Sequence, residues 1–439
     1  MTAVRSDSSG IMNELPDARA FNPHLCAATD KLKILIAEVL QQMEGYEAYY
    51  QLRKRARRPA DAENHARIVE AVICDLCVLE LTRSHSALHV PLTNRVLNTG
   101  SRYKGRVLVK ALKDVLRVMA AEEMNFLSYE KGKSIFTKTT AHLTQAPAGG
   151  QQTTFWAGPK LLSRIERFQI GFEDIGQSLE EEVIVLRDEK TRSNVPGLEL
   201  EYEETDETLR LRAEMRRINA SLAGANISCR AEHVNPSERR LRRIFNNGAF
   251  GQGGRLYGGF WQGMTSGDRQ EHILIDDDAI VELDYGQMSV MLYYAVAGLQ
   301  PPEGDLYDLS EHGISFEHRK GVKKVVQAII NSETLPGRYP TGTKALFPKS
   351  LRFCDLLKAI EAKHRGIFAS MISGVGMQMF RLESDILVGV LLELQEQGVV
   401  ALPIHDAVLV ADEHKEVARE IMIAVFRRHT GLTPAVALA

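Results

Sequence analysis

Apolar residues recur at helical spacing through the first half of the chain. Between Lys31 and Leu52 they fall every three or four positions, which is the pattern of an amphipathic helix. The same spacing predicts helices over residues 63–82 and 207–224, and a helix rich in lysine and arginine over 103–124. The amino-terminal region is therefore expected to be mainly helical.

Two strand-like pieces follow the basic helix, at residues 125–132 and 133–144, and a Lys-Gly turn joins them. A helix, a turn, a basic helix and a β-hairpin occur in this order in a winged helix, which is a DNA-binding fold. The pattern also fits a small α+β packing domain with an exposed lysine-rich face. We therefore predict a possible winged-helix DNA-binding module and keep the packing domain as the alternative.

Composition divides the chain into four segments. Residues 1–30 are polar and irregular and predict a loose amino-terminal arm, which the helical region 31–145 follows. Glycine, proline, glutamine and threonine concentrate at 143–159, which is typical of a linker. We expect a linker and mixed segment over 146–235, and the candidate chemistry lies in the last segment, 236–439.

An aspartate ends a strand-like run in the last segment. Val281, Glu282 and Leu283 precede Asp284, and the apolar stretch Met288–Ala297 beyond it predicts a buried helix. A carboxylate at such a strand-to-helix turn is well placed to hold a divalent cation. Aspartate is also a common helix N-cap residue, so capping alone is the alternative explanation.

His405 and Asp406 lie between two short apolar runs, 402–404 and 408–410, which predicts a β-hairpin with a carboxylate at its tip. Burying such a pair is costly unless its groups are paired or used. Phosphoryl transfer commonly uses two cations shared by carboxylates from different strands. Asp406 and Asp284 are therefore a candidate metal pair, with an exposed turn acid as the alternative for Asp406.

A basic helix is predicted between these two aspartates, over residues 318–330. Arg319 and Lys323 are four positions apart and so adjacent on one helical face. Two cations on one face without a nearby acid suit a triphosphate. The alternative is a solvated basic face, which is common for such helices.

The order of these features resembles motifs A, B and C of the family A DNA polymerases, which are shared in part by the phage and mitochondrial single-subunit RNA polymerases. Upstream, the segment 253–262 looks like that family's Thr-Gly-Arg-Leu-Ser-Ser segment, with Arg255 as the arginine and Gln262 as the downstream glutamine. Downstream, 373–398 resembles the helix before motif C, with Gln378 as its glutamine. The resemblance covers about residues 240–439.

The resemblance implies an α+β fold: a right-hand polymerase palm, made of an antiparallel sheet with helices, and small helical fingers within 236–439, after a thumb-like part of 146–235. It implies binding of a nucleic-acid template and primer and of nucleoside triphosphates. Two Mg²⁺ ions, with Mn²⁺ as a substitute, are the implied cofactors. Asp284, Asp406 and the backbone oxygen of Tyr285 are the implied metal ligands. Arg319 and Lys323 would bind the triphosphate, and Lys323 would also assist the leaving group. The residues implied to bind nucleic acid are Arg255, Gln262, Gln378 and His405.

Four positions depart from the family pattern. Ser289 stands where the DNA polymerases carry the glutamate that blocks the ribose 2′-hydroxyl, and Asn331-Ser332 replaces their sugar-selecting Tyr-Gly. Gln327 replaces an aromatic residue, and Ala407 replaces the glutamate of His-Asp-Glu. Ser289, Gln327 and Asn331 are thus candidate substrate-binding residues, and the sugar of the product stays open.

Three functions follow from these patterns. The first is a small DNA-dependent DNA polymerase of a plasmid or phage-like element, without a proofreading exonuclease because no paired-acid motif stands out in residues 1–230. The second is a primase or RNA polymerase that uses rNTPs. The third is a non-catalytic DNA-binding replication or regulatory protein.

Composition narrows the class of protein further. The 439 residues are 44% hydrophobic and 25% charged with a net charge of −3, so nucleic-acid binding requires local basic patches. Among five cysteines only Cys74 and Cys77 are close, and their apolar surroundings favour buried thiols over a zinc site. We find no signal peptide pattern and no long apolar span, so we expect a cytoplasmic protein with no membrane partner.

Overall fold

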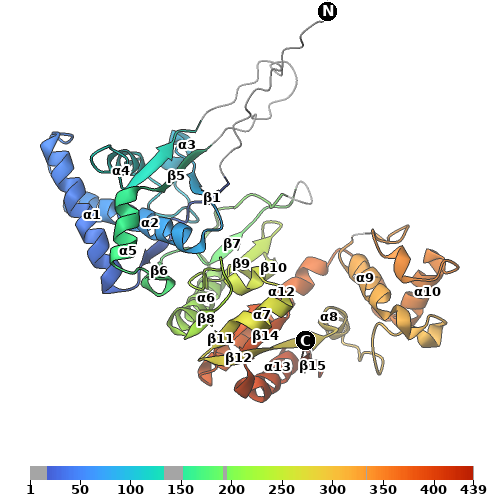
Figure 1. Ribbon diagram of the computed structural model, residues 1–439. Coiled ribbons are helices and arrows are strands. Elements are labelled where there is room, and N and C mark those ends of the chain that lie inside the picture. The colour runs from blue at the N-terminus through green and yellow to red at the C-terminus, as the bar shows by residue number, and fades with distance from the viewer. Residues whose placement is uncertain (1–16, 133–151, 191–194, 333, 439) are drawn as a thin grey trace, which may run out of the picture. The chain divides into compact units, whose positions relative to one another are not determined.

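The computed structural model describes residues 17–132, 152–190, 195–332 and 334–438, and they form a mixed α+β structure. The chain divides into two compact units. Unit 1 consists of the chain up to Ser178 together with the short segment Glu232–Ser237. Unit 2 consists of Leu179–Ala231 and Glu238–Ala439 (Figure 1). In the part of the chain that the structure describes, no helix is both long enough and apolar enough to cross a membrane.

Unit 1 is built around the long helix α2, whose residues from Ile68 to Leu79 are almost all buried. Helices pack on this apolar segment together with a four-stranded sheet of order β1-β3-β5-β4. Cys74 and Cys77 lie fully buried in it, which confirms the prediction of buried thiols. The elements of unit 1 are β1 (Ala18–Ala20), β2 (Leu25–Ala27), α1 (Asp30–Tyr49), α2 (Pro59–Thr82), β3 (Ala87–Val90), α3 (Asn94–Asn98), α4 (Ala111–Met119), β4 (Leu127–Glu130), β5 (Thr153–Ala157), α5 (Pro159–Arg167) and β6 (Ile175–Gln177).

Two predictions for unit 1 were wrong in detail. The basic helix expected over 103–124 is the shorter α4, and α3 precedes it. The linker expected over 143–159 includes the buried strand β5, which pairs with both β3 and β4. The strand expected over 133–144 lies outside the described residues, and the division of the chain into four segments stays a prediction.

Unit 2 contains a six-stranded sheet in which every ladder is antiparallel, in the order β13-β14-β12-β11-β8 with β15 also paired to β12. A second sheet has the order β10-β9-β7. The elements of unit 2 are β7 (Ile184–Leu186), α6 (Asp206–Gly224), β8 (Ile227–Cys229), β9 (Arg242–Asn246), β10 (Ala249–Tyr257), α7 (Ser266–His272), β11 (Ile273–Ile275), β12 (Asp278–Gly286), α8 (Met288–Ala297), α9 (Arg319–Ile330), α10 (Phe353–Lys363), α11 (Phe368–Met371), α12 (Gly376–Glu396), β13 (Leu402–Ile404), β14 (Ala407–Ala411), α13 (Lys415–Thr430) and β15 (Ala435–Leu438).

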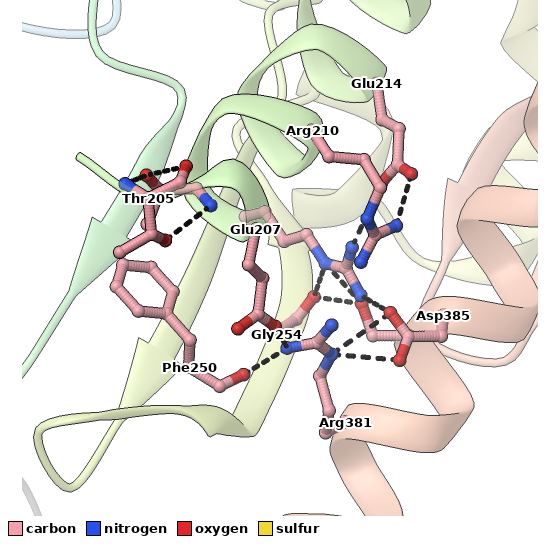
Figure 2. Close-up of polar contacts among 11 residues, drawn as sticks. Thr205, Glu207, Arg210, Glu214, Phe250, Gly254, Arg381 and Asp385 are labelled. Atoms are coloured by element: carbon pink, nitrogen blue, oxygen red, sulfur yellow. Dashed lines mark hydrogen bonds and ion pairs between the residues drawn. The ribbon is translucent and has the colours of Figure 1, made fainter.

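Helix α12 connects the parts of unit 2, because it contacts β10, α13, α6 and α8. An ion cluster fixes it to the β9–β10 hairpin (Figure 2). The fully buried Arg243 donates from Nη2 to Asp385 Oδ1 at 2.6 Å and from Nε to the Gly254 carbonyl at 3.1 Å. On α12, Arg381 also bonds Asp385, at 2.9 Å, and donates to the Phe250 carbonyl.

We expect Arg243→Met to destabilise the protein by about 3 kcal/mol, because it leaves the Asp385 carboxylate and the Gly254 carbonyl without their shared donor. The matched control is Arg217→Gln, which breaks an exposed pair between α6 and Glu396 on α12 and is expected to cost less than about 0.5 kcal/mol. Urea unfolding of both variants measures the difference. Equal losses would mean that the cluster does not hold α12.

Candidate active site

The sheet of unit 2 brings Asp284 and Asp406 to neighbouring positions. Asp284 lies on β12 opposite Ala407 of β14, and Asp406 directly precedes Ala407. His405 and Asp406 form the two-residue turn between β13 and β14, so the predicted hairpin is confirmed. His405 has a left-handed backbone with φ of 52°, an uncommon conformation that is found at tight turns. The register of two strands thus sets the spacing of the two carboxylates.

The Asp284 carboxyl is in an unfavourable place for a negative charge. Its pKa is raised to about 7, first by burial and second by the charge of Asp406, against the opposing effect of Lys323. Glu282 adds a smaller effect in the same direction, although its own carboxylate is paired with Arg269 at 2.7 Å. A carboxylate pair of this kind is favoured in its charged form only when a cation lies beside it.

The donor set fits a hard divalent cation. Two carboxylates and a backbone oxygen leave positions for water and phosphate, which is how proteins usually hold Mg²⁺. Only the backbone of Tyr285 is available for this, because its side chain is buried and its hydroxyl donates to the Met422 carbonyl at 2.7 Å. Within the described ranges no group of three or more His, Cys, Asp or Glu side chains is gathered as a metal site.

Helix α9 carries Arg319 and Lys323, as the sequence predicted. Lys323 is exposed, and its charge lowers the pKa of Asp284. Arg319 is held in place, because its Nε donates to Asp305 Oδ2 at 2.6 Å and its guanidinium lies 5.5 Å from the centre of the Tyr307 ring. One turn beyond Lys323, the Gln327 side chain lowers the pKa of the Tyr307 hydroxyl, against the larger opposing effect of burial.

Asp305 and Tyr307 are site residues that the sequence analysis missed. They lie in a segment between α8 and α9 whose backbone is fixed from several sides. Gln287 Oε1 accepts from Leu306 N at 2.5 Å, and Lys363 Nζ donates to the Asp305 carbonyl at 2.8 Å. This segment has no periodic pattern, so its only sequence signal was an acid and a tyrosine ahead of a basic helix.

A buried histidine completes the support of this segment. Burial lowers the pKa of His364 to about 4, so the ring is neutral at pH 7. Its Nε2 lies 2.9 Å from the Leu306 carbonyl, which can only accept, so Nε2 carries the proton. Its Nδ1 then accepts from the Tyr294 hydroxyl at 3.0 Å. This chain of bonds ties α8 and α10 to the segment that holds Arg319.

Two of the residues expected to contact nucleic acid, Arg255 and Gln262, already have partners within the protein. Arg255 Nε donates to the buried Glu383 at 2.7 Å, and its guanidinium lies 4.0 Å from the centre of the Phe380 ring. Gln262 is occupied, because Oε1 accepts from Gly258 N and Nε2 donates to the Leu256 carbonyl, both at 2.9 Å. Gln262 therefore stabilises its own turn and would have to leave these bonds to reach a ligand.

The remaining candidates lie near the surface. Gln378 is exposed in the first turn of α12, and His405 is exposed at the hairpin tip. Asn331 is exposed at the end of α9, where its Nδ2 donates to the Gln327 carbonyl at 2.7 Å. Ser289 is half-buried in the first turn of α8, five positions beyond Asp284. A cavity of about 730 Å³ is lined in part by Arg187, Lys190, Asn246, Arg255, Tyr257 and Phe380.

No family model and no curated protein matches this chain. The chain is similar to a solved structure, the POL domain of Pol1 from M. smegmatis in complex with a DNA primer-template and dNTP, with a TM-score of 0.32 and 11% sequence identity. The match covers 95% of this chain and 66% of that domain, so this chain spans just under two thirds of its length. Similarity at this level leaves any functional assignment to the site residues themselves.

The raised pKa of Asp284 makes a prediction about stability and pH. The folded state binds this proton more tightly than the unfolded chain, whose aspartate pKa is about 4. Metal-free protein therefore loses stability as pH rises from about 4 to about 7. Above that window, Asp284→Asn is expected to melt about 2–6 °C higher than the parent protein.

Thermal melts across pH with a chelator measure this difference, which should shrink toward about pH 5. Asp277→Asn, at an exposed acid in the turn before β12, is the control and should match the parent. Magnesium should then raise the Tm of the parent more than that of Asp284→Asn. A difference in Tm that does not change with pH would contradict the charge explanation.

Proposed function

We propose that this chain is a template-directed nucleotidyltransferase, and specifically a small DNA-dependent DNA polymerase that lacks a proofreading exonuclease. The observation that carries the proposal is the pairing of Asp284 with Asp406 on adjacent antiparallel strands, with Lys323 close enough to lower the pKa of Asp284. In this proposal the six-stranded sheet is the palm and α9–α10 are the fingers.

The two aspartates and the backbone oxygen of Tyr285 would hold two Mg²⁺ ions, with Mn²⁺ as a substitute. Bound there, the ions supply charge neutralisation at the reacting phosphate and lower the pKa of the attacking hydroxyl. The chain itself supplies position: the hairpin turn carries His405 beside Asp406, where it would contact the primer terminus. Arg255 and Gln378 would contact the nucleic acid, and Gln262 would support the turn behind them.

The basic face of α9 would bind the triphosphate of the incoming nucleotide. Lys323 is exposed and free to approach a phosphate, and its ammonium can give a proton to the departing pyrophosphate. Arg319 keeps its terminal nitrogens for phosphate, because its hydrogen bond to Asp305 uses Nε. Asp305 and Tyr307 therefore act as positioning residues that hold the guanidinium ready.

The ribose environment supports a second candidate, a primase or RNA polymerase that uses rNTPs. Ser289, which would face the sugar, is small, and Asn331 is capping the end of α9 rather than offering an aromatic ring. Tyr307, in the segment before α9, is a phenol whose hydroxyl is influenced by Gln327 of this helix. Comparison of rNTP and dNTP incorporation, with and without a primer, decides between the two.

Asp284→Asn and Asp406→Asn are each expected to lower primer extension by more than about 10³-fold, because each removes a charge that holds the cations. A labelled primer–template with magnesium or manganese measures the loss. Asp277→Asn removes an acid in the turn before the same strand and should retain activity. Extension that survives both active-site changes would falsify the proposal.

Asp305→Asn is expected to raise the nucleotide KM about 10-fold while kcat changes less than about 3-fold, because the guanidinium of Arg319 is no longer fixed before the triphosphate binds. The matched control is Asp308→Asn in the same segment, whose carboxylate bonds only Ser310 among the described residues. Steady-state extension with varied nucleotide separates KM from kcat. A loss confined to kcat would assign Asp305 a different role.

A further inference from the structure

Unit 1 contains an ordered set of elements that the proposed polymerase site does not use. Three helices and three strands follow one another as α2, β3, α3, α4, β4 and β5. The last strand, β5, pairs antiparallel with both β3 and β4 and so lies between them (Figure 1). Three helices followed by a hairpin, with the strand after the first helix closing the sheet, is the topology of a winged helix.

Helix α4 has one apolar face and one basic face. Leu112, Val115, Leu116 and Met119 are buried in the core of unit 1. The opposite face carries Lys110, Lys113 and Arg117, which recur every three or four positions, together with Asp114, whose exposed carboxylate pairs with Arg117 at 2.9 Å. The apolar face docks the helix on the unit, and the basic face is directed to the solvent.

The basic character extends over the whole of the segment from Asn94 to Arg117. Its only acid is Asp114, and its basic residues are Arg95, Arg102, Lys104, Arg106, Lys110, Lys113 and Arg117. Arg95, Arg106, Lys110 and Arg117 are exposed. In a chain whose net charge is −3, this segment is a concentrated positive surface.

The basic surface is also rigid. Lys113 Nζ donates to Asn94 Oδ1 at 2.8 Å, which ties α4 to α3. Lys104 Nζ donates to the carbonyls of Leu97 and Thr99 at 2.9 and 2.8 Å, which fixes the connection between the two helices. A nine-residue helix is about 14 Å long, and the major groove of B-DNA, about 12 Å wide, admits an α-helix.

We propose that unit 1 is a winged-helix module that binds double-stranded DNA, with α4 in the major groove and its basic face on the phosphates. This site goes beyond the proposed nucleotidyl transfer, because it lies in the other unit and uses none of the active-site residues. It anchors the chain on duplex DNA. Phosphate contacts by Lys110, Lys113 and Arg117 give the binding its strength and its dependence on salt.

The test is the affinity of the full chain for a blunt-ended DNA duplex at several salt concentrations. The variant Lys110→Gln/Lys113→Gln/Arg117→Gln should lower the slope of log Kobs against log salt by about 2 to 3 and weaken binding at least about 10-fold. The matched control, Lys33→Gln/Arg67→Gln/Arg83→Gln, removes the same charge from α1, α2 and the end of α2 and should keep the slope.

Two further measurements distinguish winged-helix binding to DNA from other ways of binding nucleic acid. Double-stranded RNA of the same sequence should bind more weakly, because its major groove is too narrow for a helix. The inactive protein Asp284→Asn/Asp406→Asn should retain the full salt slope, so this proposal and the polymerase proposal can fail separately. A slope unchanged in the α4 variant, or an equal affinity for RNA and DNA, overturns the winged-helix proposal.

Circular dichroism melts of the three variants check that unit 1 stays folded. Lys110→Gln alone, at the exposed start of α4, is the milder second variant and should lower the slope by about 1.

Discussion

The register between β12 and β14 is the constraint on which the candidate active site depends. It sets Asp284 opposite Ala407, so the residue before Ala407, Asp406, is held at the same edge. In a strand the side chains alternate between the two faces, so a slip of one residue would move Asp284 to the opposite face of the sheet. The ladder to β15 on the other side of β12 also spans Asp284 and opposes such a slip. The carboxylate pair is therefore positioned by backbone hydrogen bonds rather than by side-chain contacts.

A second constraint is the network of ion pairs that joins α12 to the β9–β10 hairpin. Asp385 receives Arg243 from β9, and two residues earlier Glu383 receives Arg255 from β10. Glu383 is buried, and burial raises its pKa against the opposing bond from Arg255. Buried charges of this kind are tolerated only when they are paired, so α12 and the β9–β10 hairpin move together. The position of Arg255 is thus fixed by the same helix that begins near Gln378.

Apolar and polar patterns could predict α1, α2, α6, α8 and α9 and the hairpin at His405-Asp406, and the family resemblance could predict α12. The predictions were wrong for the basic helix and for strand β5, where tertiary contacts determine the local structure. The basic helix begins only at Ala111, and the non-helical residues before it include Gly105, which lies so close to Pro23 that a Cβ atom would stand 2.5 Å from that ring. Strand β5 has a linker-like composition and becomes a strand because β3 and β4 pair with it on both sides. Asp305 was missed because it meets Arg319 only through the fold of the loop between α8 and α9, which has no periodic pattern.

The candidate site has a negatively charged side on the sheet and a positively charged side on α9. On the sheet, Asp284 and Asp406 repel each other, and among the described residues Lys323, which is itself exposed, is the cation that lowers the pKa of Asp284. On the helix, Arg319 is already paired with Asp305 and rests on Tyr307. A ligand that brings cations to the carboxylates and an anion to α9 satisfies both sides at once, and a nucleoside triphosphate bound with divalent cations has that distribution of charge. A cation alone would leave the exposed ammonium of Lys323 without a bound anion, and an anion alone would leave the repulsion between Asp284 and Asp406 in place.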